Sequence, residues 1–338
     1  MTDHFCMQYP TAEIVVIDRI SYAARREHLD ESVASGQVRL VEGSLLNPAL
    51  LKANLRNTDL VIHAAAESHV DNSYRNVKPF LRSNIEGTVN LLQAAVDCDI
   101  GQFLHISTDE VYGDCREMDA TAKTLLNPTN PYSASKAAAE MFVKCFAQSF
   151  GLPVRITRAN NIYGTRQYPE KLIPKLICDA LLGNTFTIHG TGATKRSFLH
   201  VEDFCHAASA ILAKGKDNEV YNIPASREYS VLEVINLVAD SIGIAKETFV
   251  RHGVDRPHND SRYGMRGNKM MALGWEPKRH LPDDIAGIVD WYRANLHLYQ
   301  ADFEPMVMDV RSGSDRRMPN HLWQSNRNAA RLAVQAND

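Results

Sequence analysis

The sequence lacks the features that mark several large classes of protein. Its 338 residues contain no run of about 18 apolar residues, and residues 1–10 lack the basic and apolar parts of a secretory signal. Its six cysteines lie far apart, without the paired spacing of metal or redox motifs, which favours a reducing compartment. The net charge of -3 argues against a nucleic-acid binder with a broad basic field. We therefore expect a cytoplasmic protein with no metal, no membrane and no nucleic acid among its partners.

Short β-branched runs alternate with helical patterns in the first half of the chain. This alternation predicts a Rossmann-like, doubly wound parallel sheet of the α/β class. Strands are expected at 13–18, 38–43, 60–66, 103–107 and 154–158, the first of them buried. Helices are expected at 84–95, 133–150, 172–182, 201–212, 231–242 and 282–296. Prolines and longer loops in the second half indicate a smaller C-terminal lobe. The predicted division is 1–165 for the cofactor domain, 166–300 mainly for the substrate lobe, and 301–338 for a tail of unknown role.

The most informative segment follows the strand predicted at 103–107. Thr108, Asp109 and Glu110 come directly after it, at the end of a strand where ligands bind in open α/β sheets. A reaction that removes one proton and protonates a leaving group needs two carboxyls in different protonation states. On its own, Thr-Asp-Glu is more often a simple acidic turn.

A second segment places a tyrosine and a lysine four residues apart. Tyr132 and Lys136 share one face of the predicted helix, behind Pro131. An ammonium beside a phenol favours the phenolate, so we expect the pKa of Tyr132 to be lowered by Lys136. Such a tyrosine can accept a hydroxyl proton while hydride leaves the same carbon.

Two further positions fit the binding of a dinucleotide. Ala64 and Ala65 follow the third predicted strand, where small side chains let a flat ligand approach the backbone; tight helix–strand packing would need the same residues. Asp18 ends the first predicted strand, where a carboxylate either binds a ribose diol or caps a turn.

Polar residues of the second half fit a nucleotide sugar. Asn161, Glu170 and Lys171 lie in or beside a proline-bounded loop and can hold sugar hydroxyls. Separated arginines can converge on a diphosphate, because guanidinium pairs with phosphate in a bidentate way, although any one of them is more often a solvated charge. The candidates for the nucleotide and diphosphate side are Arg196, Asn222, Arg256 and Tyr263.

Together these segments resemble the nucleotide-sugar 4,6-dehydratases of the extended short-chain dehydrogenase/reductase family. The resemblance runs from about Ala12 to Leu298. Its most specific parts are Ala65-Ala66-Glu67-Ser68-His69-Val70-Asp71, Ser107-Thr108-Asp109-Glu110-Val111-Tyr112-Gly113, Pro131-Tyr132-Ser133-Ala134-Ser135-Lys136, Tyr168-Pro169-Glu170-Lys171-Leu172-Ile173-Pro174 and Leu273-Gly274-Trp275.

The resemblance implies an NAD-dependent lyase of deoxysugar biosynthesis, acting on dTDP-glucose or UDP-glucose as a homodimer. Tyr132, helped by Lys136, would take the 4-hydroxyl proton as hydride passes to NAD, and Thr108 would bind that oxygen. Glu110 would remove the proton from carbon 5, and Asp109 would protonate the departing 6-hydroxyl. Asp18, Ala64, Ala65, Tyr132 and Lys136 match NAD contacts in the family. The matches to substrate contacts are Asn161, Glu170, Lys171, Arg196, Asn222, Arg256 and Tyr263.

One departure from the family concerns its glycine-rich phosphate turn. Relatives begin with a strand and a G-x-x-G-x-x-G turn, whereas no glycine precedes the strand predicted at 13–18. Roughly 20 residues, most of one half of a βαβ unit, are therefore expected to be missing from the middle of the sheet. Three interpretations stay open: an active dehydratase with a misplaced start, a related epimerase or decarboxylase, and a catalytically dead nucleotide-sugar-binding protein.

Overall fold

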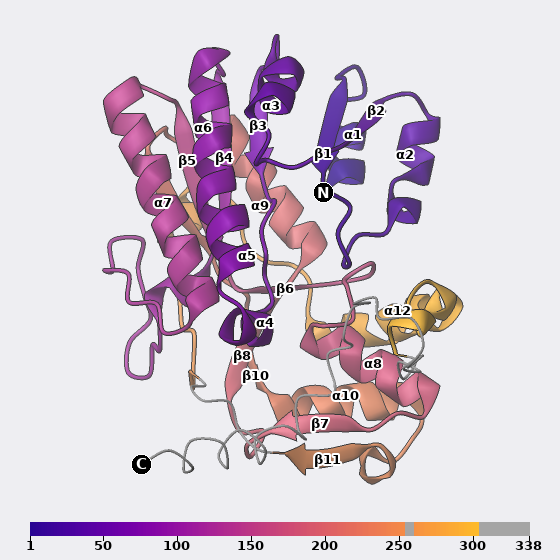
Figure 1. Cartoon of the computed structure of the whole chain (residues 1–338). Coiled ribbons are helices and arrows are strands. Elements are labelled where there is room, and N and C mark those ends of the chain that lie inside the picture. Colours follow the sequence, from indigo (N-terminus) through magenta and orange to yellow (C-terminus); the bar gives the residue numbers. More distant parts are fainter. Residues whose placement is uncertain (254–259, 304–338) are drawn as a thin grey trace, which may run out of the picture. The chain divides into compact units, whose positions relative to one another are not determined.

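The structure is a computed structural model that describes residues 1–253 and 260–303. The chain divides into two units, Met1–Tyr292 and Arg293–Asp338. In the second unit, the described residues include two short 3-10 turns, η5 (Leu296–Leu298) and η6 (Gln300–Asp302). The first unit alternates strands and helices (Figure 1) and holds every described residue that the sequence predicts for the site. The assignment of cofactor and substrate roles on either side of residue 165 stays a prediction.

A four-stranded parallel sheet forms the centre of the first unit. Its order is β3-β4-β5-β9, with bounds Leu60–His63, Gln102–Thr108, Val154–Ala159 and Glu219–Ile223. Every residue of β5 is buried, because strands flank it on both edges and helices cover both faces. Thr108, the last residue of β4, pairs with Ala159, the last residue of β5. The carboxyl ends of the two strands therefore open at the same edge of the sheet.

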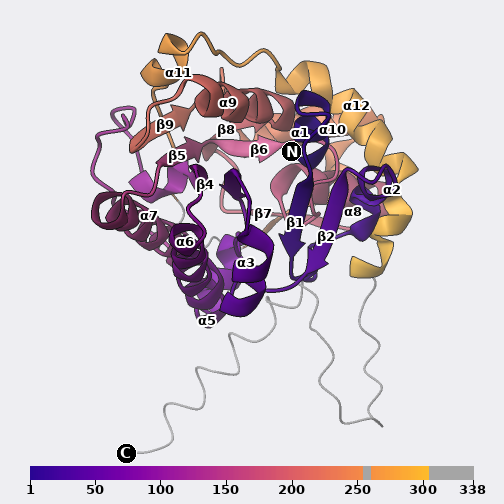
Figure 2. The same cartoon turned by 90° about the horizontal axis from the view of Figure 1, so that it is seen from above.

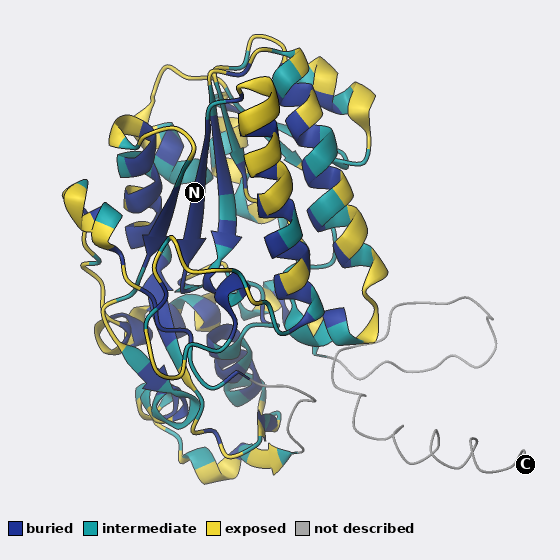
Figure 3. Cartoon of the chain, turned by 90° about the vertical axis from the view of Figure 1, so that its left-hand side faces the viewer, coloured by how far each residue is buried: buried dark blue, intermediate teal, exposed yellow. Residues whose placement is uncertain are grey.

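Helices cover both faces of this sheet, which confirms the predicted doubly wound α/β class. On one face, apolar residues of three helices pack against β4 and β5: α3 (Pro48–Leu55), α6 (Gly87–Asp97) and α7 (Pro131–Phe150). On the other face the core includes residues of α1 (Thr2–Gln8), α9 (Val201–Lys214) and α11 (Asn268–Ala272). Figure 3 shows buried strands beside helices whose outer faces are exposed.

The first two strands form a separate pair. β1 (Ile14–Asp18) and β2 (Val38–Glu42) are parallel, and no described strand joins them to the four-stranded sheet (Figure 2). The sequence predicts β1 to be a buried strand, and this is wrong, since Ile14–Ile17 are only partly buried and Asp18 is exposed. With one ladder partner among the described strands, β1 keeps an open edge.

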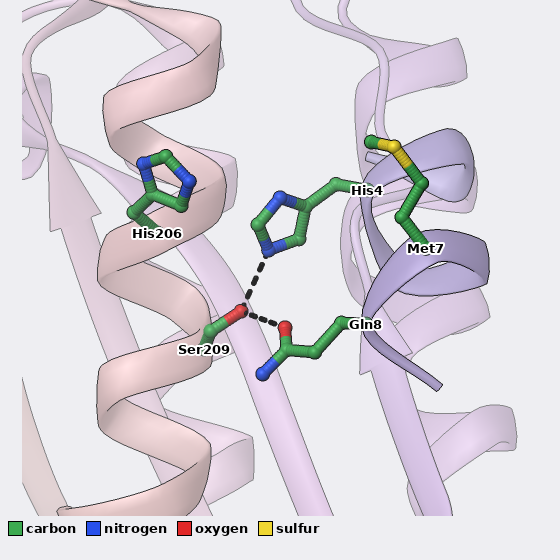
Figure 4. A pocket seen from close by; sticks show the side chains of 5 residues that line it. All are labelled: His4, Met7, Gln8, His206 and Ser209. Atoms are coloured by element: carbon green, nitrogen blue, oxygen red, sulfur yellow. Dashed lines mark hydrogen bonds between the residues drawn. The ribbon is translucent and has the colours of Figure 1, made fainter. Parts of the chain in front are cut away.

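The N-terminal helix is fixed to α9 by polar contacts. His4 Nε2 and Ser209 Oγ form a hydrogen bond of 2.8 Å, and the same hydroxyl donates to Gln8 Oε1 (Figure 4). Phe5, on the same helix, is 6% exposed and belongs to the core that also includes Leu104. Figure 4 shows the shallow groove beside these residues, and none of the residues that line it is a predicted site residue. Its hydrogen bonds therefore hold α1 against α9 and are not part of the candidate site.

The second half adds two smaller sheets and three longer helices. One sheet has the order β10-β8-β6, with bounds Glu228–Ser230, Lys195–His200 and Asn161–Tyr163, and the other joins β11 (Val250–Gly253) to β7 (Phe186–His189). The longer helices are α8 (Leu172–Leu182), α10 (Val231–Ile242) and α12 (Leu281–Ala294). The remaining short elements are η1 (Arg26–His28), α2 (Asp30–Ala34), α4 (Val70–Arg75), α5 (Lys78–Phe80), the π-helical η2 (Leu81–Glu86), η3 (Asp109–Tyr112) and η4 (Lys246–Thr248).

Candidate functional site

The acidic segment turns directly out of the end of β4. Thr108 caps the 3-10 turn η3, because its Oγ1 accepts a hydrogen bond of 3.3 Å from the Glu110 backbone N–H. Gly113 ends the turn with φ of 74°, and a Cβ there would lie 2.2 Å from Asn127 O. Only glycine fits this position. The local sequence therefore holds Asp109 and Glu110 at the carboxyl edge of the sheet.

The first turn of α7 lies against this segment. Asn130 caps the helix in a capping box with Ser133, and Pro131 occupies its first turn. Tyr132 is 9% exposed, and its hydroxyl interacts with the Thr108 side chain. Lys136 lies one turn later, 4% exposed, and its Nζ donates to Ile106 O at 2.6 Å. The two predicted motifs thus meet in space.

The ionisation of Tyr132 differs from the prediction. Its pKa is raised rather than lowered, because burial disfavours the phenolate and the Glu110 and Asp109 carboxylates oppose a further negative charge. Burial also lowers the pKa of Lys136 to about 8, although Glu140 acts in the opposite direction. Sequence spacing does not report desolvation, which is the largest cause of the raised pKa of Tyr132.

Asp109 has the properties of an acid that is protonated near neutral pH. Its side chain is 3% exposed, and burial raises its pKa to about 7 against the lowering effect of a hydrogen bond from Asn160. Thr108 Oγ1 lies 3.1 Å from Asp109 Oδ1, and Asn160 Nδ2 lies 2.7 Å from Asp109 Oδ2. Its neighbour Glu110 is only partly buried, so the two carboxyls have different surroundings.

Two asparagines that the sequence motifs do not single out hold the two carboxyls. Asn160 donates to Asp109, and Asn130 Nδ2 donates to Glu110 Oε2 at 3.1 Å. The position of Asn130 before Pro131 is a visible helix-cap signal, but nothing in the sequence links it to Glu110. For Asn160 the sequence carries no signal beyond its place at the end of a strand.

A buried ion pair joins β5 to α7, the helix that carries Tyr132 and Lys136. Arg158 and Glu140 are 1% and 0% exposed, and Arg158 Nε lies 3.0 Å from Glu140 Oε1. Arg158 also donates to the hydroxyl of Tyr112 at 2.7 Å, and that hydroxyl donates to Asn222 Oδ1 at 2.7 Å. The network connects α7, β5, η3 and β9. It occupies the side chain of Asn222, which is 2% exposed.

The loop residues predicted for the sugar lie between β6 and α8. Asn161 is partly buried on β6. Glu170 Oε2 accepts a hydrogen bond of 2.6 Å from Tyr22 OH, and Lys171 Nζ donates to Ser68 O at 2.5 Å. These contacts join the loop to the segments that follow β1 and β3.

Two of the residues predicted for the nucleotide and diphosphate side lie in contact with each other. The Arg196 guanidinium lies over the Tyr263 ring, 4.7 Å from its centroid. Tyr263 OH donates to Asp260 Oδ2 at 2.6 Å. Arg256 lies outside the described residues.

The predicted cofactor residues other than Tyr132 and Lys136 lie on exposed strand ends. Asp18 ends β1, and Ala64 and Ala65 follow β3. Ser107 is 6% exposed, and its hydroxyl has no hydrogen-bond partner among the described residues. An exposed carboxylate, small residues and an unpaired hydroxyl fit the ribose and ring of a dinucleotide. No glycine lies before Gly36, so the fit does not extend to a glycine-rich phosphate turn.

The described residues form neither a membrane span nor a metal site. In the part of the chain that the structure describes, no helix is long and apolar enough to cross a membrane. Across residues 1–253 and 260–303, no group of three or more His, Cys, Asp and Glu side chains is arranged to hold a metal ion.

The fold and the paired tyrosine and lysine define a dinucleotide-dependent class of enzyme. The chain belongs to the NAD dependent epimerase/dehydratase family, which matches residues 4–224. Within it, the chain is 37% identical over 296 residues to the mouse (Mus musculus) dTDP-D-glucose 4,6-dehydratase, covering 86% of this chain and 83% of that protein. It resembles the crystal structure of DesIV, a dTDP-glucose 4,6-dehydratase from Streptomyces venezuelae with NAD and TYD bound. Here the TM-score is 0.84 at 38% identity, with 87% of this chain and 92% of that one covered.

A plant relative extends the comparison to another nucleotide. The chain is 41% identical over 293 residues to RHM2 of Arabidopsis thaliana, named a trifunctional UDP-glucose 4,6-dehydratase, UDP-4-keto-6-deoxy-D-glucose 3,5-epimerase and UDP-4-keto-L-rhamnose-reductase. The match covers 85% of this chain but 44% of RHM2, so the chain spans less than half of that protein.

Proposed function

We propose that the chain is a lyase that converts dTDP-glucose to dTDP-4-keto-6-deoxyglucose with NAD as cofactor. The observation that carries this proposal is the meeting of Thr108, Asp109 and Glu110 with Tyr132 at one edge of the sheet. An epimerase has no need of the carboxyl pair. Asn160 and Asn130 each donate a hydrogen bond to one of those carboxyls and so fix their positions, which supports catalysis over a binding role alone.

The residues divide the proton transfers among them. Asp18, Ala64, Ala65, Tyr132 and Lys136 would hold NAD, which would supply an acceptor for hydride from carbon 4 and a donor of hydride to carbon 6. Tyr132 accepts the proton of the 4-hydroxyl, whose oxygen Thr108 binds. The positive charge of Lys136, one helix turn away, favours the phenolate form in which Tyr132 can accept that proton, against the burial that raises its pKa.

The two carboxyls act on carbons 5 and 6. Glu110 removes the proton from carbon 5, which the 4-keto group has made acidic. Asp109 delivers its proton to the departing 6-hydroxyl, and its pKa of about 7 keeps this proton available near neutral pH. In this assignment one carboxyl is the base and the other is the acid.

The substrate residues form a second part of the proposal. Asn161, Glu170 and Lys171 bind the sugar and base side, and Arg196, Arg256 and Tyr263 bind the nucleotide and diphosphate side. Asn222, whose side chain is buried and bonded to Tyr112 and Ala120, supports this side from within the fold. The guanidinium of Arg196 over the Tyr263 ring supports this assignment, since a phosphate can accept from it in a bidentate way.

UDP-glucose is the second candidate substrate. The 41% identity to RHM2 makes it a candidate, although the chain covers 44% of RHM2 against 83% of the mouse protein. Parallel assays of the two nucleotide sugars at equal concentration would rank them by kcat/KM.

We also propose that the protein is a cytoplasmic homodimer formed through α7. Met141, Phe142 and Phe150 are 61%, 40% and 56% exposed on this helix, a cluster of apolar surface that a second copy would cover. Sedimentation equilibrium of the chain and of Phe142→Glu tests the assembly, and a dimer in both would contradict the role of α7.

Incubation of the purified chain with dTDP-glucose and NAD tests the reaction. We expect the alkaline-labile 4-keto-6-deoxy product, with Tyr132→Phe as an inactive control of nearly the same shape. Absence of product, together with no NAD retained on the protein, would reject the proposal.

A further inference from the structure

The orientation of the Asn160 side chain is fixed by an unambiguous donor. Asn160 Oδ1 accepts a hydrogen bond of 2.9 Å from the backbone N–H of Ala225. A backbone N–H only donates, so the atom that faces Ala225 must be the oxygen. The amide nitrogen therefore lies on the other side, 2.7 Å from Asp109 Oδ2. Asn160 is 4% exposed, so water does not compete freely for these bonds.

We propose that Asn160 is a positioning residue that gives the two oxygens of Asp109 different roles. Asp109 Oδ2 accepts from Asn160 in both protonation states, and Asp109 Oδ1 carries the transferable proton. This inference rests on the proposed function, in which Asp109 is the acid.

The contacts of the second oxygen support this division. Thr108 Oγ1 donates to Asp109 Oδ1 at 3.1 Å when Asp109 is a carboxylate, and the same hydroxyl can accept from a protonated Oδ1 instead. The Thr108 side chain also interacts with the hydroxyl of Tyr132. A proton on Oδ1 therefore lies beside the hydroxyls that face the reacting sugar. A proton on Oδ2 would face the Asn160 amide, whose N–H groups cannot accept it.

The proton transfer balances with Asn160 as a spectator. Glu110 takes the proton of carbon 5, and the electron pair of that bond forms the double bond between carbons 5 and 6. As it forms, the proton of Asp109 Oδ1 passes to the 6-hydroxyl oxygen, the bond between carbon 6 and that oxygen breaks, and water departs. Asp109 becomes a carboxylate, and the Asn160 N–H then stabilises its charge. A hydrogen bond to the charged form makes the proton easier to release than burial alone would allow.

Asn130 makes the equivalent contact with Glu110, but its replacement would not test the role of such a contact cleanly. Its Oδ1 accepts from the Ser133 N–H at 2.9 Å, and its Nδ2 donates to Glu110. Because Asn130 also caps α7, its replacement would loosen the helix that carries Tyr132 and Lys136. Asn160 caps no helix.

Other ionisable groups act on Asp109, and the experiment must leave them in place. Glu110 on the same turn raises the pKa of Asp109, and Arg196 on β8 lowers it. Tyr132 on α7 and Cys115 beyond η3 also interact electrostatically with Asp109. None of these four residues is changed in the Asn160 variants that test the proposal.

The test uses infrared difference spectroscopy of the full chain across a pH titration. The band of the protonated Asp109 carboxyl is identified by its loss in Asp109→Asn. In Asn160→Leu the carbonyl oxygen of this carboxyl loses its donor, so its stretching band should move to higher frequency. The titration midpoint should rise by about one to two pH units, the worth of a hydrogen bond to a charged group.

A second variant, Asn160→Asp, keeps the proposal testable if Asn160→Leu does not fold. Asn160→Asp keeps an oxygen for the Ala225 N–H and replaces the donor with an acceptor. Two facing carboxyls then share a proton, and the midpoint should rise by at least as much. Asn236→Ala, on the exposed side of α10, serves as the matched control and should leave band and midpoint unchanged.

The outcomes separate this inference from the proposed function. An unshifted band and midpoint in both Asn160 variants would overturn the role of Asn160, whatever the activity. Shifts in a chain without dehydratase activity would support the role of Asn160 and reject the proposed function. With activity present, the pH at which kcat falls should move upward in the variants together with the midpoint.

Discussion

The two parts of the proposed active site are built in different ways. The catalytic side rests on β4 and β5, inner strands of a four-stranded sheet with helices on both faces. The cofactor side rests partly on β1, which has one ladder partner among the described strands and is only partly buried. Both sides carry residues that the family resemblance selects.

The residues proposed for proton transfer and Asp18, proposed for NAD binding, therefore lie in parts of the fold that differ in burial. Asp109, Tyr132 and Lys136 are held by the main core, whereas Asp18 depends on a strand pair with an open edge. We therefore expect changes on the catalytic side to act on turnover and global stability. Changes in β1 should act locally and on the affinity for NAD.

The largest expected effect comes from Glu110→Gln. Removal of the base should lower kcat by about 10²–10⁴-fold while oxidation at carbon 4 still proceeds. Absorbance of reduced nicotinamide should therefore accumulate in a single turnover, with the affinity for NAD unchanged. Glu117→Gln, an exposed neighbour in the loop after η3, is the matched control. Unchanged turnover in Glu110→Gln would remove Glu110 from the base role.

The pH dependence of stability should reveal the buried carboxyl of Asp109. Its folded pKa of about 7 lies above the ordinary value of 3.8, so the native state binds more protons between these values. The free energy of unfolding should therefore fall as pH rises through this window, by up to about 4 kcal/mol from Asp109. In Asp109→Asn this contribution is absent, so the variant should gain stability over the wild type as pH rises. Urea unfolding across the window measures the difference, and parallel curves would contradict a raised pKa.

Substitution of one isoleucine on each side compares directly how much the two sides contribute to the free energy of unfolding. Ile156 on β5 is 2% exposed, whereas Ile17 on β1 is only partly buried. Ile156→Ala should lower the free energy of unfolding by about 2–5 kcal/mol, and Ile17→Ala by about 1 kcal/mol, since less apolar area is lost. Urea unfolding at one pH measures both. Equal losses would show that β1 is as firmly built into the core as β5.

The sequence predicted the helices and strands better than it predicted the burial and contacts of individual side chains. The patterns at 172–182 and 231–242 match α8 and α10 residue for residue, because each amphipathic run has a clear stop at glycine. The strands predicted to end at residues 107 and 158 each run one residue further, to Thr108 and Ala159. What spacing alone could not report was burial. The raised pKa of Tyr132 and the contact of Asn160 with Asp109 depend on how distant segments pack.

The smallest expected effect tests the open edge itself, amide by amide. The N–H of Ile14 bonds to Gln37 O, next to β2, and amides alternate between the two edges of a strand. Those of Val15 and Ile17 therefore point toward the open edge, whereas β5 has ladders on both sides. Hydrogen exchange should show Val15 and Ile17 less protected than Ile14 and Val16 by about 1 kcal/mol of opening free energy. Neighbouring amides of β5 should show no such alternation, and uniform protection along β1 would mean that its second edge is covered.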